Sequence, residues 1–154
     1  MPVLVRKRDG SVRWCVDFRA LNDRTVKDCF PLPIIEDCVD SLQGATTFCN
    51  LDLASGFYHI ELEESDRTKT AFITRYGLLE HTRMGMGLCN APATFQRALQ
   101  LVLRGLTWNQ VLVYLDDVVI LGKDLREALL RFRKYSMKLK PKKCEIFRYE
   151  VEFL

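Results

Sequence analysis

Three carboxylates occupy positions that are otherwise apolar in the sequence. Asp116 and Asp117 are adjacent, and they separate two runs of aliphatic and β-branched residues at 111–115 and 118–121. Asp52 has a leucine on either side. A buried carboxylate is costly unless it is paired or bound to a cation, and hard divalent cations prefer oxygen ligands such as carboxylates. The three acids are therefore candidates for a divalent-cation site.

Each of these acids also has a purely structural interpretation. Aspartate is a common turn residue, so Asp116 and Asp117 could form an ordinary solvated loop. Asp52 could be a helix N-cap or a turn residue. The apolar flanks of the Asp116–Asp117 pair favour the cation site, because both segments are too apolar for a solvated loop.

Two strand patterns would position these acids. Residues 111–121 predict a buried β-hairpin with both carboxylates at its turn, and residues 46–53 predict a strand that ends near Asp52. A two-residue hairpin turn normally needs a residue with φ > 0, yet residues 111–121 contain no glycine. The hairpin thus departs from the usual turn chemistry at a charged site, as functional positions often do.

The remaining patterns predict one compact α+β unit. Strands are expected at 3–5 and 12–18, joined by a basic turn with Asp-Gly, and a second hairpin at 68–74 and 78–84. Helices are expected at 34–42, at 91–103 with Asn90 as N-cap and Pro92 in the first turn, and at 124–137. Short closing strands are expected at 145–147 and 151–154.

Composition narrows the class of protein. The chain has 154 residues, 48% hydrophobic and 28% charged, which suits one globular domain. It has no apolar run of about 20 residues and no signal-peptide core at its charged start, so we expect an intracellular protein without a membrane partner.

The charges are unevenly distributed along the chain. Residues 123–148 carry ten basic and three acidic side chains, whereas residues 31–122 carry six basic and eleven acidic ones. An acidic middle beside a basic end suits a metal site next to a phosphate-binding surface, although a basic helix is often only a solvated face.

Six motifs occur together and in order over nearly the whole chain. They are Val16-Asp17-Phe18-Arg19-Ala20-Leu21-Asn22, Phe30-Pro31-Leu32-Pro33, Leu51-Asp52-Leu53-Ala54-Ser55-Gly56-Phe57, Asn90-Ala91-Pro92-Ala93-Thr94-Phe95-Gln96, Tyr114-Leu115-Asp116-Asp117 and Leu139-Lys140-Pro141-Lys142-Lys143-Cys144. Together they resemble the reverse transcriptase of gypsy-type LTR retrotransposons. Each motif alone is weak, but six in register make the resemblance specific.

The resemblance implies an α+β fold, the palm of a right-hand polymerase with partial fingers, in which an antiparallel sheet packs on helices and a thumb is absent. Fingers would comprise about 1–45 and 68–90, and palm about 46–67 and 91–154. It implies RNA-directed DNA polymerase activity on an RNA or DNA template with a primer, using deoxynucleoside triphosphates. The cofactor would be two Mg²⁺ ions, with Mn²⁺ as a substitute, and the setting the cytoplasm, the nucleus or a virus-like particle. The oligomeric state is left open.

The resemblance also assigns residue roles. Asp52, Asp116 and Asp117 match the metal-binding carboxylates, and Lys7 and Arg13 fall where the family binds the incoming triphosphate. Phe57 matches the aromatic residue that excludes a ribose 2′-hydroxyl. Met86 would line the nucleotide pocket and Tyr114 would lie beside the primer end. The residues expected to face the nucleic-acid backbone are Arg126, Arg131, Lys138, Lys140, Lys142 and Lys143.

Two departures from the family pattern support an alternative function. Where family members usually have Met-Pro-Phe-Gly, this chain has Met-Gly-Met-Gly at 84–87, which loosens a segment of the nucleotide pocket. The helix after Lys123 is also shorter than the family's by about two turns. The alternatives to an active polymerase fragment are a decayed or domesticated remnant that retains the fold and binds nucleic acid, and a structural α+β domain without that role.

Overall fold

The structure of the chain is a computed structural model that describes residues 2–6, 10, 12–31, 33–40, 42–107, 110–115 and 117–151. The chain divides into two compact units. The first comprises residues 1–28 and 57–92, and the second comprises residues 29–56 and 93–154. The division into fingers and palm stays a prediction.

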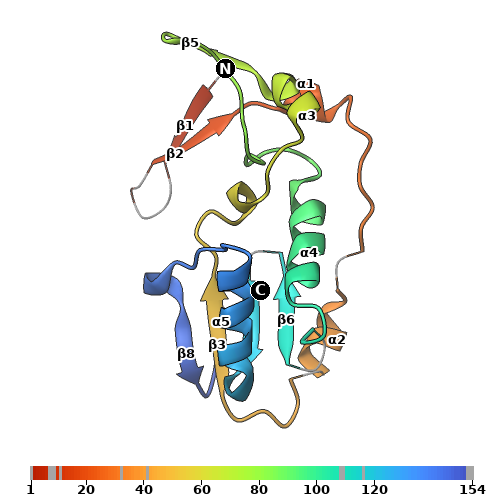
Figure 1. The fold of residues 1–154 in the computed structure, drawn as a ribbon, viewed down its shortest axis with the longest axis vertical. Helices are drawn as coiled ribbons and strands as arrows, with labels where there is room; N and C mark the ends of the chain where they lie inside the picture. Colours follow the sequence, from red (N-terminus) through yellow and green to blue (C-terminus); the bar gives the residue numbers. More distant parts are fainter. Residues whose placement is uncertain are drawn as a thin grey trace. The chain divides into compact units, whose positions relative to one another are not determined.

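The first unit contains two small antiparallel hairpins and short helical turns (Figure 1). Its elements are β1 (Pro2–Arg6), β2 (Val12–Val16), α1 (Arg19–Asn22), α3 (Glu64–Arg67), the 3₁₀ turn η2 (Thr68–Thr70), β4 (Phe72–Thr74) and β5 (Gly77–Leu79). The 3₁₀ turn η1 (Gly56–His59) begins at the boundary between the units. Val16, Phe18 and Phe72 form the buried cluster of the first unit.

The hairpin predicted at 68–74 and 78–84 is shorter than expected. Residues 64–70 form α3 and η2, and β5 ends at Leu79. This helical start is polar, with Glu64 and Asp66 in its first turn and no buried residue in α3, so it lacks the apolar periodicity that would have indicated a helix. Strand β2 also ends earlier than predicted, because the Asp17 carboxylate accepts the Arg19 N–H at 3.0 Å as α1 begins.

The second unit is built on a four-stranded antiparallel sheet in the order β6-β7-β3-β8. Its strands are β3 (Phe48–Asp52), β6 (Val111–Tyr114), β7 (Asp117–Leu121) and β8 (Glu145–Arg148). Its helices are α2 (Ile35–Asp40), most of α4 (Ala91–Val102), α5 (Leu125–Lys134) and the 3₁₀ turns η3 (Gly122–Asp124) and η4 (Pro141–Lys143). These elements confirm the expected antiparallel sheet packed on helices. Val151 lies outside any strand, and residues 152–154 fall outside the described residues.

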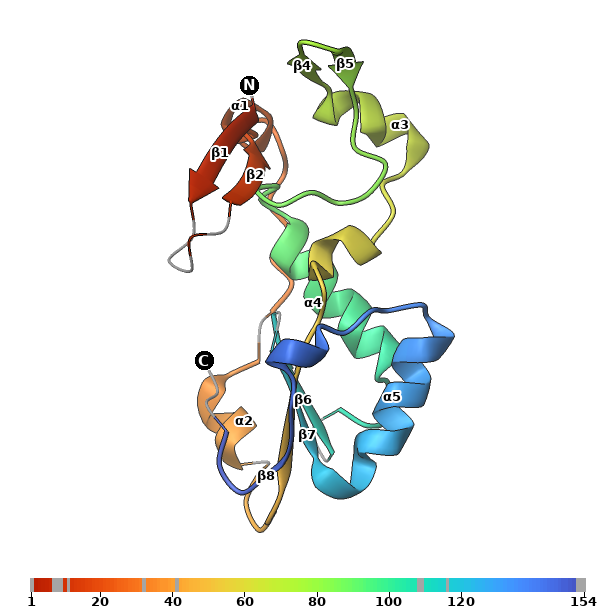
Figure 2. The ribbon, with the colours of Figure 1, turned by 90° about the vertical axis from the view of Figure 1, so that its left-hand side faces the viewer.

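The two faces of this sheet have different environments. Figure 2 shows α4 and α5 together on one side of the sheet and α2 on the other. Along β3, Cys49 and Leu51 are fully buried while Phe48, Asn50 and Asp52 are half-buried, as the alternation of side chains in a strand requires. We call the face that carries Asn50 and Asp52 the site face. The opposite face supplies the core against the helices, where Phe95 and Phe132 are buried.

Only part of the site face is covered by apolar residues. Leu112 and Val119 form a buried cluster on which Leu42, Phe48 and Val151 pack.

No helix in the described part of the chain is long and apolar enough to cross a membrane.

Candidate active site

Asp52 and Asp117 face each other across two neighbouring strands. Strands β3 and β7 are antiparallel, and the register pairs Asp52 with Asp117 at the ends of the two strands. Directly opposed residues in such a pair have Cβ atoms about 4.5–5.5 Å apart, and like charges at these positions repel. Both side chains are half-buried on the site face. The fold therefore places two carboxylates where a cation would relieve their repulsion.

Asp52 is thus the last residue of a strand, and the alternative of a helix cap does not hold. The turn of the central hairpin also differs from the prediction. Asp117 is the first residue of β7 rather than a turn residue, and Leu115 supplies the positive φ, at 52°, that the missing glycine would have provided. Asp116 lies outside the described residues, so its expected role stays a prediction.

The charge of the pair is partly balanced by a lysine. Lys143 Nζ lies 3.3 Å from Asp52 Oδ2. Burial raises the pKa of Asp117, and the negative charge of Asp52 raises it further, whereas the ammonium of Lys143 lowers it. Lys143 therefore acts on both carboxylates, but one positive charge does not neutralise two negative ones.

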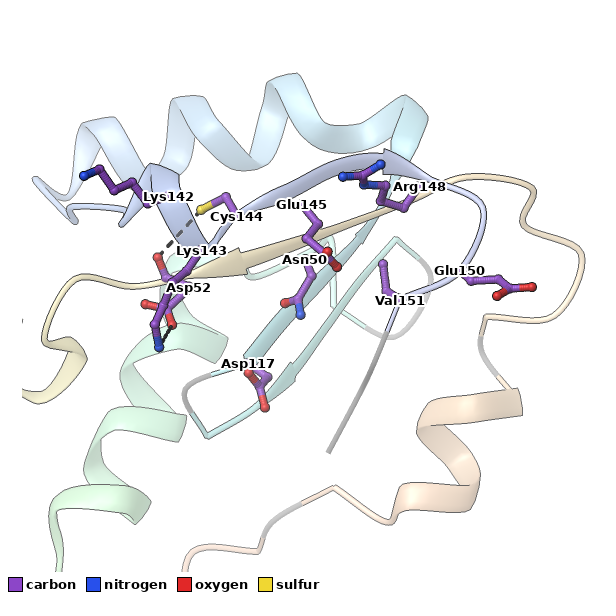
Figure 3. Close-up of a pocket in the computed structure, with 10 residues that line it drawn as sticks. All are labelled: Asn50, Asp52, Asp117, Lys142, Lys143, Cys144, Glu145, Arg148, Glu150 and Val151. Atoms are coloured by element: carbon purple, nitrogen blue, oxygen red, sulfur yellow. Dashed lines mark hydrogen bonds and ion pairs between the residues drawn. The ribbon is translucent and has the colours of Figure 1, made fainter. Parts of the chain in front are cut away.

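A groove of about 1060 Å³ opens at these residues. It is lined by Asn50, Asp52, Asp117, Lys142, Lys143, Cys144, Glu145, Arg148, Glu150 and Val151. Figure 3 shows the side chains of Asn50, Asp52 and Asp117 on the same side of the sheet, with Lys143 directed at Asp52 and Lys142 pointing away from it. No group of three or more His, Cys, Asp or Glu side chains suited to a metal lies within the described residues, which include only two of the three predicted ligands.

A buried glutamine that the sequence reasoning missed holds the turn of the central hairpin. Gln96, on α4, is completely buried. Its Nε2 donates to the Val113 carbonyl at 2.8 Å, and its Oε1 accepts the Leu115 N–H at 2.8 Å. Gln96 lies three residues before the buried Leu99, so it falls on the apolar face of the helix. A polar residue on that face could have indicated a buried hydrogen-bonding role from the sequence.

The residues predicted to bind the nucleotide fall in different parts of the chain. Tyr114 is half-buried at the end of β6 and pairs in register with Asp117. Phe57, in η1, and Met86 are half-buried and belong to the first unit. Lys7 lies outside the described residues, as does the side chain of Arg13, whose backbone is part of β2. These roles stay predictions.

The basic residues predicted to face nucleic acid also differ among themselves. Arg126, Lys138, Lys140, Lys142 and Lys143 are exposed. Arg131 instead bonds to Glu127, at 2.8 Å, and to the carbonyl groups of Val102 and Arg104, at 3.4 and 2.9 Å. Its guanidinium therefore secures the end of α4 to α5, and its predicted contact with nucleic acid is untested.

Comparisons with known proteins agree with this architecture. A family model described as reverse transcriptase (RNA-dependent DNA polymerase) matches residues 5–154. The chain is 40% identical over 149 residues to the retrovirus-related Pol polyprotein from transposon 412 of Drosophila melanogaster, covering 92% of this chain and 12% of that protein. It is 43% identical over 110 residues to an RNA-directed DNA polymerase homolog of Oenothera berteroana, covering 71% and 78%.

Solved structures show the same fold. A foamy viral protease-reverse transcriptase in complex with double-stranded DNA matches with a TM-score of 0.88 and 25% identity, over 98% of this chain and 28% of that one. The resemblance to retrotransposon enzymes is confirmed by the polyprotein relatives, and the narrower gypsy-type assignment is compatible with them. With a family model that spans residues 5–154, the chain belongs to the reverse transcriptase family.

Proposed function

We propose that this chain carries the nucleotide-adding site of an RNA-directed DNA polymerase, which transfers deoxynucleotides onto a primer 3′-hydroxyl. The chain spans only 12% of the transposon 412 polyprotein, so polymerase activity is a proposal for this chain. The observation that carries it is the pairing of Asp52 with Asp117 on the site face, in a chain of this family.

The donor set fits divalent cations. Two opposed carboxylates repel each other, and the pKa of Asp117 is raised partly by Asp52, so a cation between them would relieve an unfavourable interaction. We assign Asp52, Asp116 and Asp117 as ligands of two Mg²⁺ ions, with Mn²⁺ as a substitute. When bound about 3.5–4 Å apart, such ions activate the attacking hydroxyl and stabilise the leaving pyrophosphate.

The other residues would bind and orient the substrates. Lys7 and Arg13 would bind the triphosphate, and Met86 and Tyr114 would line the nucleotide and primer positions. Phe57 would exclude a ribose 2′-hydroxyl. A template with its primer is the proposed partner, since the foamy viral relative is a complex with double-stranded DNA. The exposed basic residues of 126–143 would contact its phosphates. The cytoplasm, the nucleus or a virus-like particle is the proposed setting.

A second candidate is a remnant that binds nucleic acid without catalysis. It is favoured by the segment at 84–87, where Gly85 replaces the usual proline. A Cβ at Gly85 would lie 3.3 Å from the His81 imidazole, so a larger residue at this position would require the imidazole to shift. Such a remnant would retain duplex binding and lack nucleotide transfer.

Primer extension separates the two candidates. The full chain is assayed on poly(rA) with an oligo(dT) primer in Mg²⁺ or Mn²⁺, beside Asp117→Asn and the groove control Glu145→Gln. The proposal expects extension by the wild type and the control and its loss in Asp117→Asn. Absence of extension by the wild type, together with salt-sensitive duplex binding in fluorescence anisotropy, would support the remnant and refute the polymerase.

A further inference from the structure

Backbone contacts hold the segment that contains Lys143 beside the end of β3, next to Asp52. The segment before η4 lies against the end of β3, where Leu139 forms a β-bridge with Leu53. The Lys140 N–H donates to the Asp52 carbonyl at 2.8 Å, and the Lys143 N–H donates to the Lys140 carbonyl at 2.9 Å. The backbone of Lys143 is thus held close to the residue whose carboxylate its ammonium contacts, which lowers the entropy lost when the ion pair forms.

The ion pair can be broken at small cost. The Lys143 side chain is 58% exposed and that of Asp52 is 35% exposed, so solvent screens their attraction. A single ammonium leaves one negative charge on the pair of carboxylates, whereas a divalent ion balances both. The two carboxylates can therefore be balanced by either cation. A metal ion bound to both carboxylates would compete with the Lys143 ammonium, which lies 3.3 Å from Asp52 Oδ2, for the same oxygen atoms.

We propose that Lys143 is the internal counter-cation of the metal-free site and that a divalent ion must displace it to bind Asp52 and Asp117. This inference rests on the proposed function, because it concerns the same carboxylates. Lys143 stabilises the opposed ends of β3 and β7 when no metal is bound, and it lowers the affinity of the site for metal. It is a positioning residue for the aspartates.

Metal affinity tests the competition directly. Mn²⁺ binding to the full chain is measured by electron paramagnetic resonance at fixed ionic strength, without nucleotide or nucleic acid. Lys143→Met should bind Mn²⁺ about two- to fivefold more tightly than the wild type, the range expected when a screened ion pair no longer has to be broken. Lys143→Arg should keep the wild-type affinity. Lys142→Met, which removes a neighbouring charge directed away from Asp52, should change it less than Lys143→Met.

Thermal unfolding gives a second readout that a merely structural lysine would not produce. In EDTA, Lys143→Met should unfold at a lower temperature than the wild type, because the two carboxylates are left without a counter-cation. With saturating Mg²⁺ the difference should shrink or reverse, since tighter metal binding adds more stability. A loss of stability that is equal with and without metal would overturn the proposal.

The outcomes also separate this proposal from the proposed function. If Asp52→Asn and Asp117→Asn leave Mn²⁺ binding unchanged, the metal site itself is wrongly assigned and both proposals fail. If these variants lose Mn²⁺ binding but Lys143→Met binds no more tightly than Lys142→Met, the role of Lys143 alone is refuted.

Discussion

Gln96 offers the sharpest test of how the fold positions the site. The perturbation is Gln96→Met, which keeps the length and flexibility of the side chain but removes both hydrogen bonds to the hairpin. Val113 is 4% exposed, so its carbonyl would be left buried without this donor, at about 1–3 kcal/mol. Leu115 is half-buried, and the loss of the hydrogen bond from its N–H to Gln96 adds a further cost of about 1 kcal/mol.

We therefore expect Gln96→Met to lower the free energy of unfolding by about 2–4 kcal/mol. Leu115, with its φ of 52°, keeps an unfavourable backbone conformation only while its surroundings hold it, so the turn should also relax. Since catalytic groups tolerate little displacement, primer extension should fall by about tenfold or more.

Urea denaturation followed by circular dichroism measures the first effect, and primer extension by the folded fraction measures the second. The matched control is Gln100→Met, the same substitution one helical turn later at a half-buried position. Equal urea midpoints and equal extension rates for Gln96→Met and Gln100→Met would refute the reasoning that Gln96 holds the turn.

Three further predictions follow from other parts of the chain. Phe57→Val should lower discrimination against ribonucleotides by about tenfold or more in single-nucleotide extension, and unchanged discrimination would remove Phe57 from that role. Burial lowers the pKa of His81 below 6.5, so the folded state resists its protonation and stability should fall as the pH drops below 6.5; His81→Phe should flatten this dependence in thermal melts from pH 7 to pH 5. Arg131→Met should cost about 1–2 kcal/mol in urea denaturation because carbonyl groups at the end of α4 lose a donor, whereas the exposed Arg126→Met should stay within about 0.5 kcal/mol of the wild type.

Much of the fold can be predicted from local sequence. The two apolar runs on either side of the acidic pair predicted the central hairpin, observed as β6 and β7, and the apolar spacing after Asn90 predicted a helix at 91–103, observed as α4 at Ala91–Val102. The hairpin was found because strands buried on both faces are apolar throughout, and the helix was found because the spacing of its apolar residues reflects its buried face. The polar helix α3 was missed for the same reason, since it has no buried face.

The residue types of the candidate site were also evident in the sequence, because a carboxylate among leucines or valines has few inexpensive structural explanations. The residues that support the site, Gln96 and Lys143, could not be recognised in the sequence. Gln96 occupies a helix face that the sequence marks as apolar, and the residues it holds are 17 and 19 positions away. Lys143 was grouped with a basic surface, although its ammonium contacts Asp52.

The sequence by itself identified the acids that are candidates for a cation site and the strands that carry them, because both depend on neighbours within a few residues. Only the tertiary structure decided that Asp52 lies opposite Asp117, 65 positions later in the chain, and that the ammonium of Lys143 partly balances their negative charge. Strand register and long-range ion pairs depend on how the whole sheet assembles. A shift of one residue would send every side chain of β3 to the other face, which is why local patterns could not fix this pairing.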